Sequence, residues 1–135
     1  MKQAIASFGA VGLALVTACA VAEMPGPAEG QTLFQENCAI CHGPAGRGDG
    51  LIAAGLRPAP PDQTRIAFRE DGAFPRMKVL SDIDGYARRA PDDSMPEFGL
   101  LLEGDTVPVV LEDGTLSPVP RPLAALLVYI ESIQR

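Results

Sequence analysis

Apolar residues recur at helical spacing most clearly near the end of the chain. From Pro122 onward they stand three or four positions apart, as expected for the buried face of one helix: Leu123, Leu126, Leu127, Ile130 and Ile133. Pro122 suits the first turn of this helix, where a missing amide N–H costs no hydrogen bond. A shorter helix is predicted over residues 29–39, with Leu33 and Phe34 on its apolar side.

Glycine and proline interrupt the helical pattern between these two segments. Residues 43–61 and 91–99 are predicted to be loops because both residue types are frequent there. Short helices are expected over 62–70, capped by Asp62, and over 75–84. A hairpin around Asp113-Gly114 is expected within residues 105–118, and Pro108 confines its first arm to a sheet edge.

The first residues have the layout of a secretory signal. Lys2 supplies a positive charge, residues 4–16 are mostly apolar, and small residues follow up to Ala22. The apolar stretch is shorter than the roughly 20 residues that span a bilayer, and an uncleaved signal that remains in the membrane is an alternative. We therefore expect a removed signal over 1–22, a flexible tether over 23–29, one domain over 30–135, and a periplasmic location.

A second interpretation of the same segment makes the protein a lipoprotein. Val16-Thr17-Ala18-Cys19 resembles a bacterial lipobox, so the signal would end at residue 18 and Cys19 would carry the lipid. Several acyl chains anchor a protein firmly, whereas one alone binds a membrane only marginally. The alternative is that Cys19 is discarded with the signal.

The charge balance is acidic. The chain carries 11 Lys and Arg against 17 Asp and Glu, and loss of Lys2 with the signal leaves ten against seventeen, a net charge of about −7. Without a basic patch, nucleic acid is not expected as a partner. An acidic surface favours protein partners with a basic docking face, although solubility alone explains it equally well.

The domain itself predicts a thin core. It has no tryptophan and is rich in glycine and proline, and a domain of this size buries only about two thirds of its surface. A large apolar cofactor at its centre would supply the missing contacts.

One cysteine motif carries most of the chemistry. Cys38-Ala39-Ile40-Cys41-His42 is the C-x-x-C-H pattern of covalent c-type haem attachment. Two thiols three residues apart in a helical turn project from one side of the backbone, where both can reach the vinyl groups of a haem. The adjacent imidazole of His42 then lies over the ring and can bind the iron.

Three alternative roles for the cysteine pair fit the sequence less well. A structural zinc site needs four protein ligands, and after Cys19 is set aside the chain offers only Cys38, Cys41 and His42. A thiol-disulfide oxidoreductase needs a βαβ setting, whereas a glycine-rich loop follows here. A plain disulfide gives His42 no role.

The second axial ligand of the iron has to come from elsewhere, because His42 is the only histidine. A thioether paired with histidine is a known haem ligation that raises the reduction potential. Met95 is favoured because it lies in a loop before Pro96. Met24 lies in the predicted tether, and Met77 lies in a predicted helical turn, where methionine is usually core filler. Met77 and an open sixth position remain alternatives.

The order of three motifs resembles class I bacterial cytochromes c: Cys38-x-x-Cys41-His42-Gly43, Gly46-Arg47-Gly48-Asp49-Gly50, and Ser94-Met95-Pro96-Glu97-Phe98-Gly99. The resemblance covers residues 30–135. It implies an all-α class I fold around one haem c. Residues 100–121, which include the short β-hairpin, depart from the family pattern as an insertion before the last helix. This insertion is either a docking surface for a particular partner or decoration.

The resemblance also assigns supporting roles. It implies that Gly30, Phe34 and Tyr129 pack where the terminal helices cross. It further implies that the carbonyl of Pro58, or alternatively of Pro60, accepts a hydrogen bond from the outer nitrogen of the histidine ligand.

Together these observations predict an exported monohaem c-type cytochrome that carries one electron between redox partner proteins and is not an enzyme. Cys38 and Cys41 would hold the haem, and His42 and Met95 would hold its iron. Two alternatives remain: a haem c subunit of a dehydrogenase or oxidase complex, and a haem enzyme or gas-binding protein if the sixth position is open. Membrane contact would come through a lipid on Cys19 or through an uncleaved signal.

Overall fold

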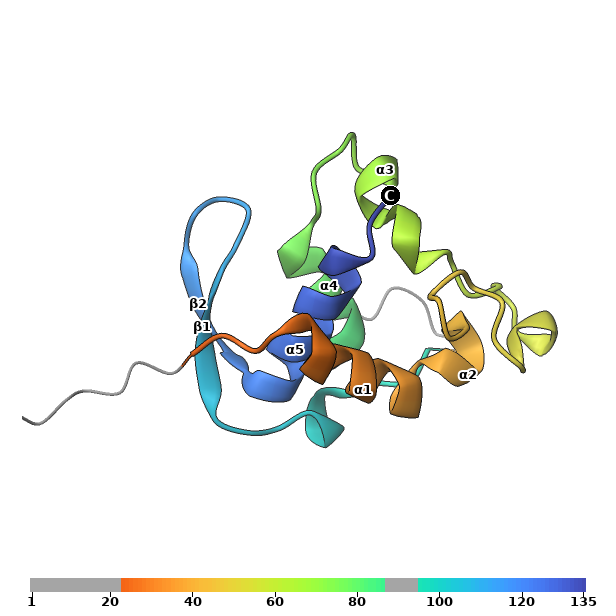
Figure 1. Cartoon of the computed structure of the whole chain (residues 1–135), viewed down its shortest axis with the longest axis horizontal. Coiled ribbons are helices and arrows are strands. Elements are labelled where there is room, and N and C mark those ends of the chain that lie inside the picture. Colours follow the sequence, from red (N-terminus) through yellow and green to blue (C-terminus); the bar gives the residue numbers. More distant parts are fainter. Residues whose placement is uncertain (1–22, 87–94) are drawn as a thin grey trace, which may run out of the picture.

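The computed structural model describes residues 23–86 and 95–135 (Figure 1). Its α-helices, 3₁₀ helices (η) and strands follow in the order α1 Pro27–Asn37, α2 Ala39–His42, η1 Ala53–Gly55, η2 Gln63–Arg65, α3 Ile66–Arg69, α4 Arg76–Asp84, η3 Gly99–Leu101, β1 Thr106–Val110, β2 Leu116–Pro120 and α5 Arg121–Ser132. The predicted signal and Cys19 lie outside the described residues. Within those residues, no helix is both long and apolar enough to cross a membrane.

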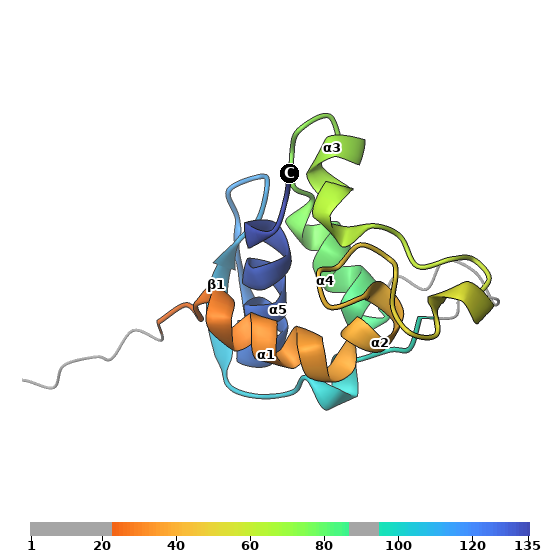
Figure 2. The ribbon, with the colours of Figure 1, turned by 45° about the vertical axis from the view of Figure 1, so that its right-hand side comes forward.

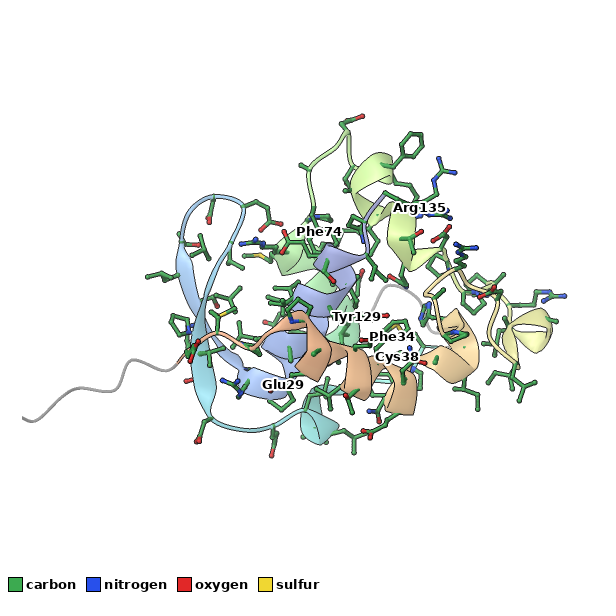
Figure 3. The ribbon with its side chains drawn as sticks, in the orientation of Figure 1. Glu29, Phe34, Cys38, Phe74, Tyr129 and Arg135 are labelled. Atoms are coloured by element: carbon green, nitrogen blue, oxygen red, sulfur yellow. The ribbon has the colours of Figure 1, made fainter. Side chains whose placement is uncertain are left out.

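The first and last helices cross at Gly30. A side chain at this position would collide with the carbonyl of Ala125 and with Tyr129, so the two backbones touch where only glycine fits. Phe34 and Tyr129 pack at the crossing, with ring centroids 5.2 Å apart and planes at 55° (Figure 3). The packing roles expected for these residues are confirmed. The crossing fixes the direction in which α1 leads into Cys38.

Helix α5 lies at the centre of the fold, between α1, α4 and the hairpin (Figure 2). Residues 123–127 of this helix are buried without interruption because three elements cover it. The core cluster is completed by apolar side chains from α1, α3, α4 and the insertion: Phe34, Ile66, Val79, Leu80, Ile83, Leu102, Val107, Val109, Leu111 and Val119.

The predicted hairpin is present. Strands β1 and β2 pair antiparallel, with Val107 opposite Val119. In the turn, the carboxylate of Asp113 accepts hydrogen bonds from the amide N–H of Thr115 at 2.9 Å and from its hydroxyl at 2.6 Å. Gly114 takes the left-handed φ of +83° that the turn requires. Among residues 23–86 and 95–135, the fold is therefore mostly helical with one small two-stranded sheet.

Element bounds differ from the predicted ones in two places. Helix α1 begins at Pro27, so residues 27–29 of the predicted tether form its first turn. The helix predicted over 62–70 is a 3₁₀ turn followed by the short α3, and Asp62 caps the 3₁₀ turn by accepting the amide N–H of Thr64 at 2.9 Å.

Ion pairs connect both ends of α5 to other helices. At its start Arg121 pairs with Glu29 of α1, and near its end Glu131 pairs with Arg76 of α4.

Candidate functional site

A single helical turn carries both cysteines and the histidine. Cys38 ends α1 and begins α2, and its carbonyl accepts the amide N–H of Cys41 at 3.1 Å and that of His42 at 2.9 Å. Both cysteines are half-buried free thiols. The local structure is therefore the helical turn that the C-x-x-C-H spacing predicts, and the α1–α5 crossing sets its position.

The glycine-rich loop after His42 folds back over the end of α2 and satisfies carbonyls that the helix leaves unpaired. The amide N–H of Gly48 donates to the carbonyl of His42 at 2.8 Å, and that of Gly50 donates to the carbonyl of Cys41 at 3.1 Å. Gly43 turns the chain with a left-handed φ of +79°. A side chain at Gly50 would press against Cys41, since its Cβ would lie 2.5 Å from the Cys41 carbonyl. The left-handed backbone at Gly43 and the close approach of two backbone segments at Gly50 explain why glycine stands at these two positions.

The imidazole of His42 is held inside this loop. Its side chain is buried, with the residue 7 % exposed. Its Nδ1 lies 3.4 Å from the carbonyl oxygen of Pro61 and 3.0 Å from the side-chain amide nitrogen of Gln63. The expectation that Pro58 or Pro60 supplies the carbonyl is wrong. The chain reaches the ring one residue after Pro60, where the amide N–H of Gln63 donates to the carbonyl of Gly46 and fixes the approach.

These contacts are compatible with metal binding through one of the two ring nitrogens. An imidazole that binds through Nε2 carries its proton on Nδ1. In that tautomer Nδ1–H donates to the Pro61 carbonyl, and Gln63 presents its amide oxygen to the ring after a half-turn of the amide. In that tautomer the ring orientation is fixed, and Nε2 is the nitrogen left for a metal.

Burial disfavours charge at Cys38 and at His42. Burial raises the pKa of the Cys38 thiol to about 11, and the neighbouring Cys41 adds to the effect. Burial also lowers the pKa of His42, while its contact with the Pro61 carbonyl opposes that change. A neutral Cys38 sulfur and a neutral His42 imidazole are therefore favoured at pH 7.

Met95 borders the same core as the cysteine turn. It lies in a non-helical segment, is half-buried, and packs against the core cluster that Cys38 also contacts. The segment that begins at residue 95 starts near α2 in both ribbon views and runs back to η3 (Figures 1 and 2). The amide N–H of Phe98 donates to the carbonyl of Ile83 at 3.0 Å and ties this segment to α4.

The other two methionines lie elsewhere. Met77 is in the first turn of α4 and 52 % exposed, so the expectation that it fills the core is wrong. Its amide N–H donates to the carboxylate of Glu112 in the hairpin turn at 3.1 Å. Met24 is exposed ahead of α1. Of the three candidates, only Met95 packs against the described core cluster, which Cys38 also borders.

The alternative roles of the cysteine pair find no support in the described residues. No group of three or more His, Cys, Asp and Glu residues there could hold a metal ion, and a structural zinc site needs four ligands. Cys38 joins α1 to α2, Cys41 lies within α2, and a glycine-rich loop follows; the two strands of the described fold form a separate hairpin. This is not the βαβ setting of a dithiol oxidoreductase.

Pro61 and Gln63 are the site residues that sequence reasoning missed. Several prolines stand close together in this loop, and no spacing rule tells which carbonyl faces the ring. No motif marks Gln63 either. The one available signal is the Asp62 cap, because a turn that begins there places residue 63 at the start of a fixed backbone segment.

Comparison with known proteins gives one match. A protein-family model described as Cytochrome c matches residues 27–106. The matched segment runs from the start of α1 to the first residue of β1 and includes Cys38, Cys41, His42 and Met95. No curated protein and no solved structure matches the chain.

Proposed function

The chain belongs to the cytochrome c family, and on that premise we propose that it is an exported, periplasmic electron carrier of the class I type. One haem c would be bonded to Cys38 and Cys41, with its iron ligated by His42 and Met95. The observation that carries the proposal is the buried imidazole of His42, which follows two thiols in one helical turn and is held by Pro61 at Nδ1. Redox proteins that donate and accept single electrons would be its partners.

The surrounding residues support this role because they would hold the haem and the His42 ring in fixed positions. Bound haem would supply the one-electron chemistry of its iron. Cys38 and Cys41 would hold the macrocycle by two thioethers on one helical turn, and Pro61 and Gln63 would fix the plane of the His42 ring. Because the turn is tied to α1 and covered by the glycine loop, little of the chain would reorganise when an electron moves. No substrate bond is made or broken, so we propose no enzymatic activity.

Ligation by Met95 is supported by its packing. Its side chain lies against the apolar cluster that Cys38 borders, and Pro96 keeps its backbone out of helical geometry. With Met95 and His42 both holding the iron, the thioether would raise its reduction potential.

A second candidate function is a haem c subunit fixed to a larger redox complex. The observation that favours it is the hairpin, which begins where the family match ends and presents apolar side chains to solvent. Such a surface is common in assemblies and unusual in a freely diffusing protein.

Covalent haem attachment tests the central proposal. The full chain, produced with a c-type haem attachment system, should retain one haem per chain through acid-acetone extraction and give a haem c pyridine spectrum. Cys38→Ala with Cys41→Ala should release the haem, while Cys19→Ala, the matched change at the third cysteine, should retain it. Haem that extracts freely from the unaltered protein would contradict the proposal.

A further inference from the structure

The hairpin has an apolar face that no other described element covers. Residues directly opposite in an antiparallel pair point to the same side, and the register pairs Thr106 with Pro120, Pro108 with Pro118, and Val110 with Leu116. Val107, Val109 and Val119 point to α5 and are buried. The opposite side, here called the outer face, therefore consists of three cross-strand pairs in which only Thr106 is polar.

The apolar side chains of this outer face are unusually exposed. Val110 is 47 % exposed and Leu116 is 67 % exposed. A two-layer antiparallel arrangement normally alternates apolar residues toward the core with polar residues toward water. In β1, buried and exposed residues alternate as expected, but the residues that face water are apolar as well.

The two opposed prolines indicate how a partner would approach. Pro108 and Pro118 lack an amide N–H, so their pair cannot be one of the hydrogen-bonded pairs of the ladder. In such a pair the amide N–H of each residue would point away from the other strand, toward the open edge of the hairpin. Both edges therefore lack an N–H donor at the middle of the strand. Both edges are poor templates for an added strand, which leaves the outer face as the surface for contact.

A groove lies between the hairpin and α4. It has a volume of about 460 Å³. Its lining includes Pro118 and Pro120 of the outer face, Ser117 and Val119 of the inner side, Met77 at the start of α4, and Tyr86 just beyond its end. Met77 and Tyr86 are exposed. Methionine and tyrosine are enriched at protein interfaces, and the groove could receive apolar side chains of a partner.

Acidic residues border this surface at both ends. Residues 97–120 contain five acidic residues and no lysine or arginine. Glu103 and Asp105 precede β1, and Glu112 and Asp113 lie in the turn. The guanidinium of Arg76 donates a hydrogen bond to the carbonyl of Val110 at 2.7 Å and is paired with Glu131. Lys78 is paired with Asp82, and Arg121, directly after β2, is paired with Glu29.

The hairpin also lies apart from the cysteine turn. In both ribbon views it flanks α5 on one side of the molecule, while α2 and the glycine loop lie on the other (Figures 1 and 2). A partner seated on the outer face would leave the haem-attachment side free.

We propose that the outer face and its groove dock a different protein, whose contact surface has an apolar centre bordered by lysine or arginine. Charge complementarity selects this occupant. A second copy is disfavoured because a two-fold contact pairs equivalent patches, and any such pairing brings acidic ends together. An anionic membrane surface is disfavoured by the same carboxylates.

A defined peptide tests the stated chemistry with the mature haem-loaded chain. The probe is a fluorescein-labelled peptide with a Leu-Tyr-Leu centre between two lysine pairs, and its match replaces that centre by three serines. Anisotropy should show binding of the first peptide, about ten-fold tighter than the second, with affinity falling as salt is added. This outcome does not depend on haem ligation, which the absorption spectrum reports separately.

Paired variants locate the binding. Val110→Thr with Leu116→Asn should weaken peptide binding about ten-fold, whereas Leu51→Asn, at a 90 % exposed position in the loop after α2, should leave it unchanged. Glu103→Gln with Asp105→Asn should weaken binding at low salt, and Glu70→Gln with Asp71→Asn should not. Equal affinity in the hairpin variants and their controls would overturn the proposal.

Two further measurements address the other occupants. Sedimentation of the haem-loaded chain should give a monomer at all concentrations, and phosphatidylcholine vesicles with or without phosphatidylglycerol should not bind it once the signal and any lipid are removed. A dimer that dissociates in the Leu116→Asn variant would show that a second copy of the chain occupies the outer face. Vesicle binding lost in that variant would assign it to a membrane, and either result overturns the proposal.

Discussion

Met95→Ala and Met77→Ala form a matched pair of changes that locate the second iron ligand. Met95 packs against the core cluster that Cys38 also borders, whereas Met77 lies in the first turn of α4 next to the hairpin. Met95→Ala should remove the sulfur ligand, open the iron to carbon monoxide and lower the reduction potential, because the thioether raises it. Met77→Ala should leave all three properties unchanged.

The structure also sets the expected cost in stability. Truncating a fully buried methionine to alanine costs about 2–5 kcal/mol. Met77 is 52 % exposed, so about half of that apolar contact is absent from the start, and we expect about 1–2 kcal/mol from Met77→Ala. Met95→Ala should cost more, because the loss of an iron–sulfur bond adds to the loss of packing.

Three measurements on each variant complete the test. The ferric spectrum reports the weak far-red sulfur-to-iron band, the ferrous protein with carbon monoxide reports an open site, and urea unfolding gives the free energy of unfolding. If the far-red band survives in Met95→Ala and disappears in Met77→Ala, the ligand assignment is wrong and the packing of Met95 is only structural.

The remaining predictions concern the fold around the site. Gly30→Ala should destabilise the protein by about 1–3 kcal/mol, because the new Cβ would lie 2.5 Å from the carbonyl carbon of Ala125. Gly55→Ala, where nothing lies within 4 Å, should change stability by less than about 1 kcal/mol, and equal urea midpoints for the two variants would contradict the close crossing. Hydrogen bonds from Thr64, helped by Arg135, hold the pKa of Asp62 below its usual value. Its contribution to stability is therefore complete above about pH 4 and lost as pH falls through the lower folded pKa. Asp62→Asn should flatten this part of the stability curve in urea unfolding at stepped pH, and an unchanged slope would count against the role of Asp62.

The fold was predictable where one physical signal dominates a segment. The apolar spacing of residues 123–133 predicts α5, and the Asp113-Gly114 turn predicts the hairpin, because both patterns depend on local geometry. The bounds of α1 and the division of the 62–70 segment were less accurate. Helix α1 begins at Pro27, a local signal of the same kind as Pro122 in the last helix, and the predicted bounds did not use it.

The sequence predicts the chemistry of the candidate site, but it does not predict which residues hold the His42 ring. The cysteine and histidine spacing is a local motif and points to one cofactor. Which carbonyl faces His42 depends on the path of the whole loop from residue 43 to residue 63, whose shape follows from contacts such as that between Gln63 and Gly46. The exposure of Met77 likewise depends on how the hairpin packs against α4. Neither outcome is encoded in neighbouring residues.

The hairpin therefore has two roles on its two faces. The thin core expected from the sequence is partly supplied by the insertion, since Leu102, Val107, Val109, Leu111 and Val119 all belong to the described core cluster. Packing of these side chains accounts for the apolar inner face, but it places no demand on Val110, Pro108 or Leu116, which point away from α5. A hairpin needed only to complete the core would carry polar residues there, because such residues keep a small protein soluble. The apolar outer face thus requires a reason outside the chain, and a docked partner is the reason that its acidic border and blunted edges favour.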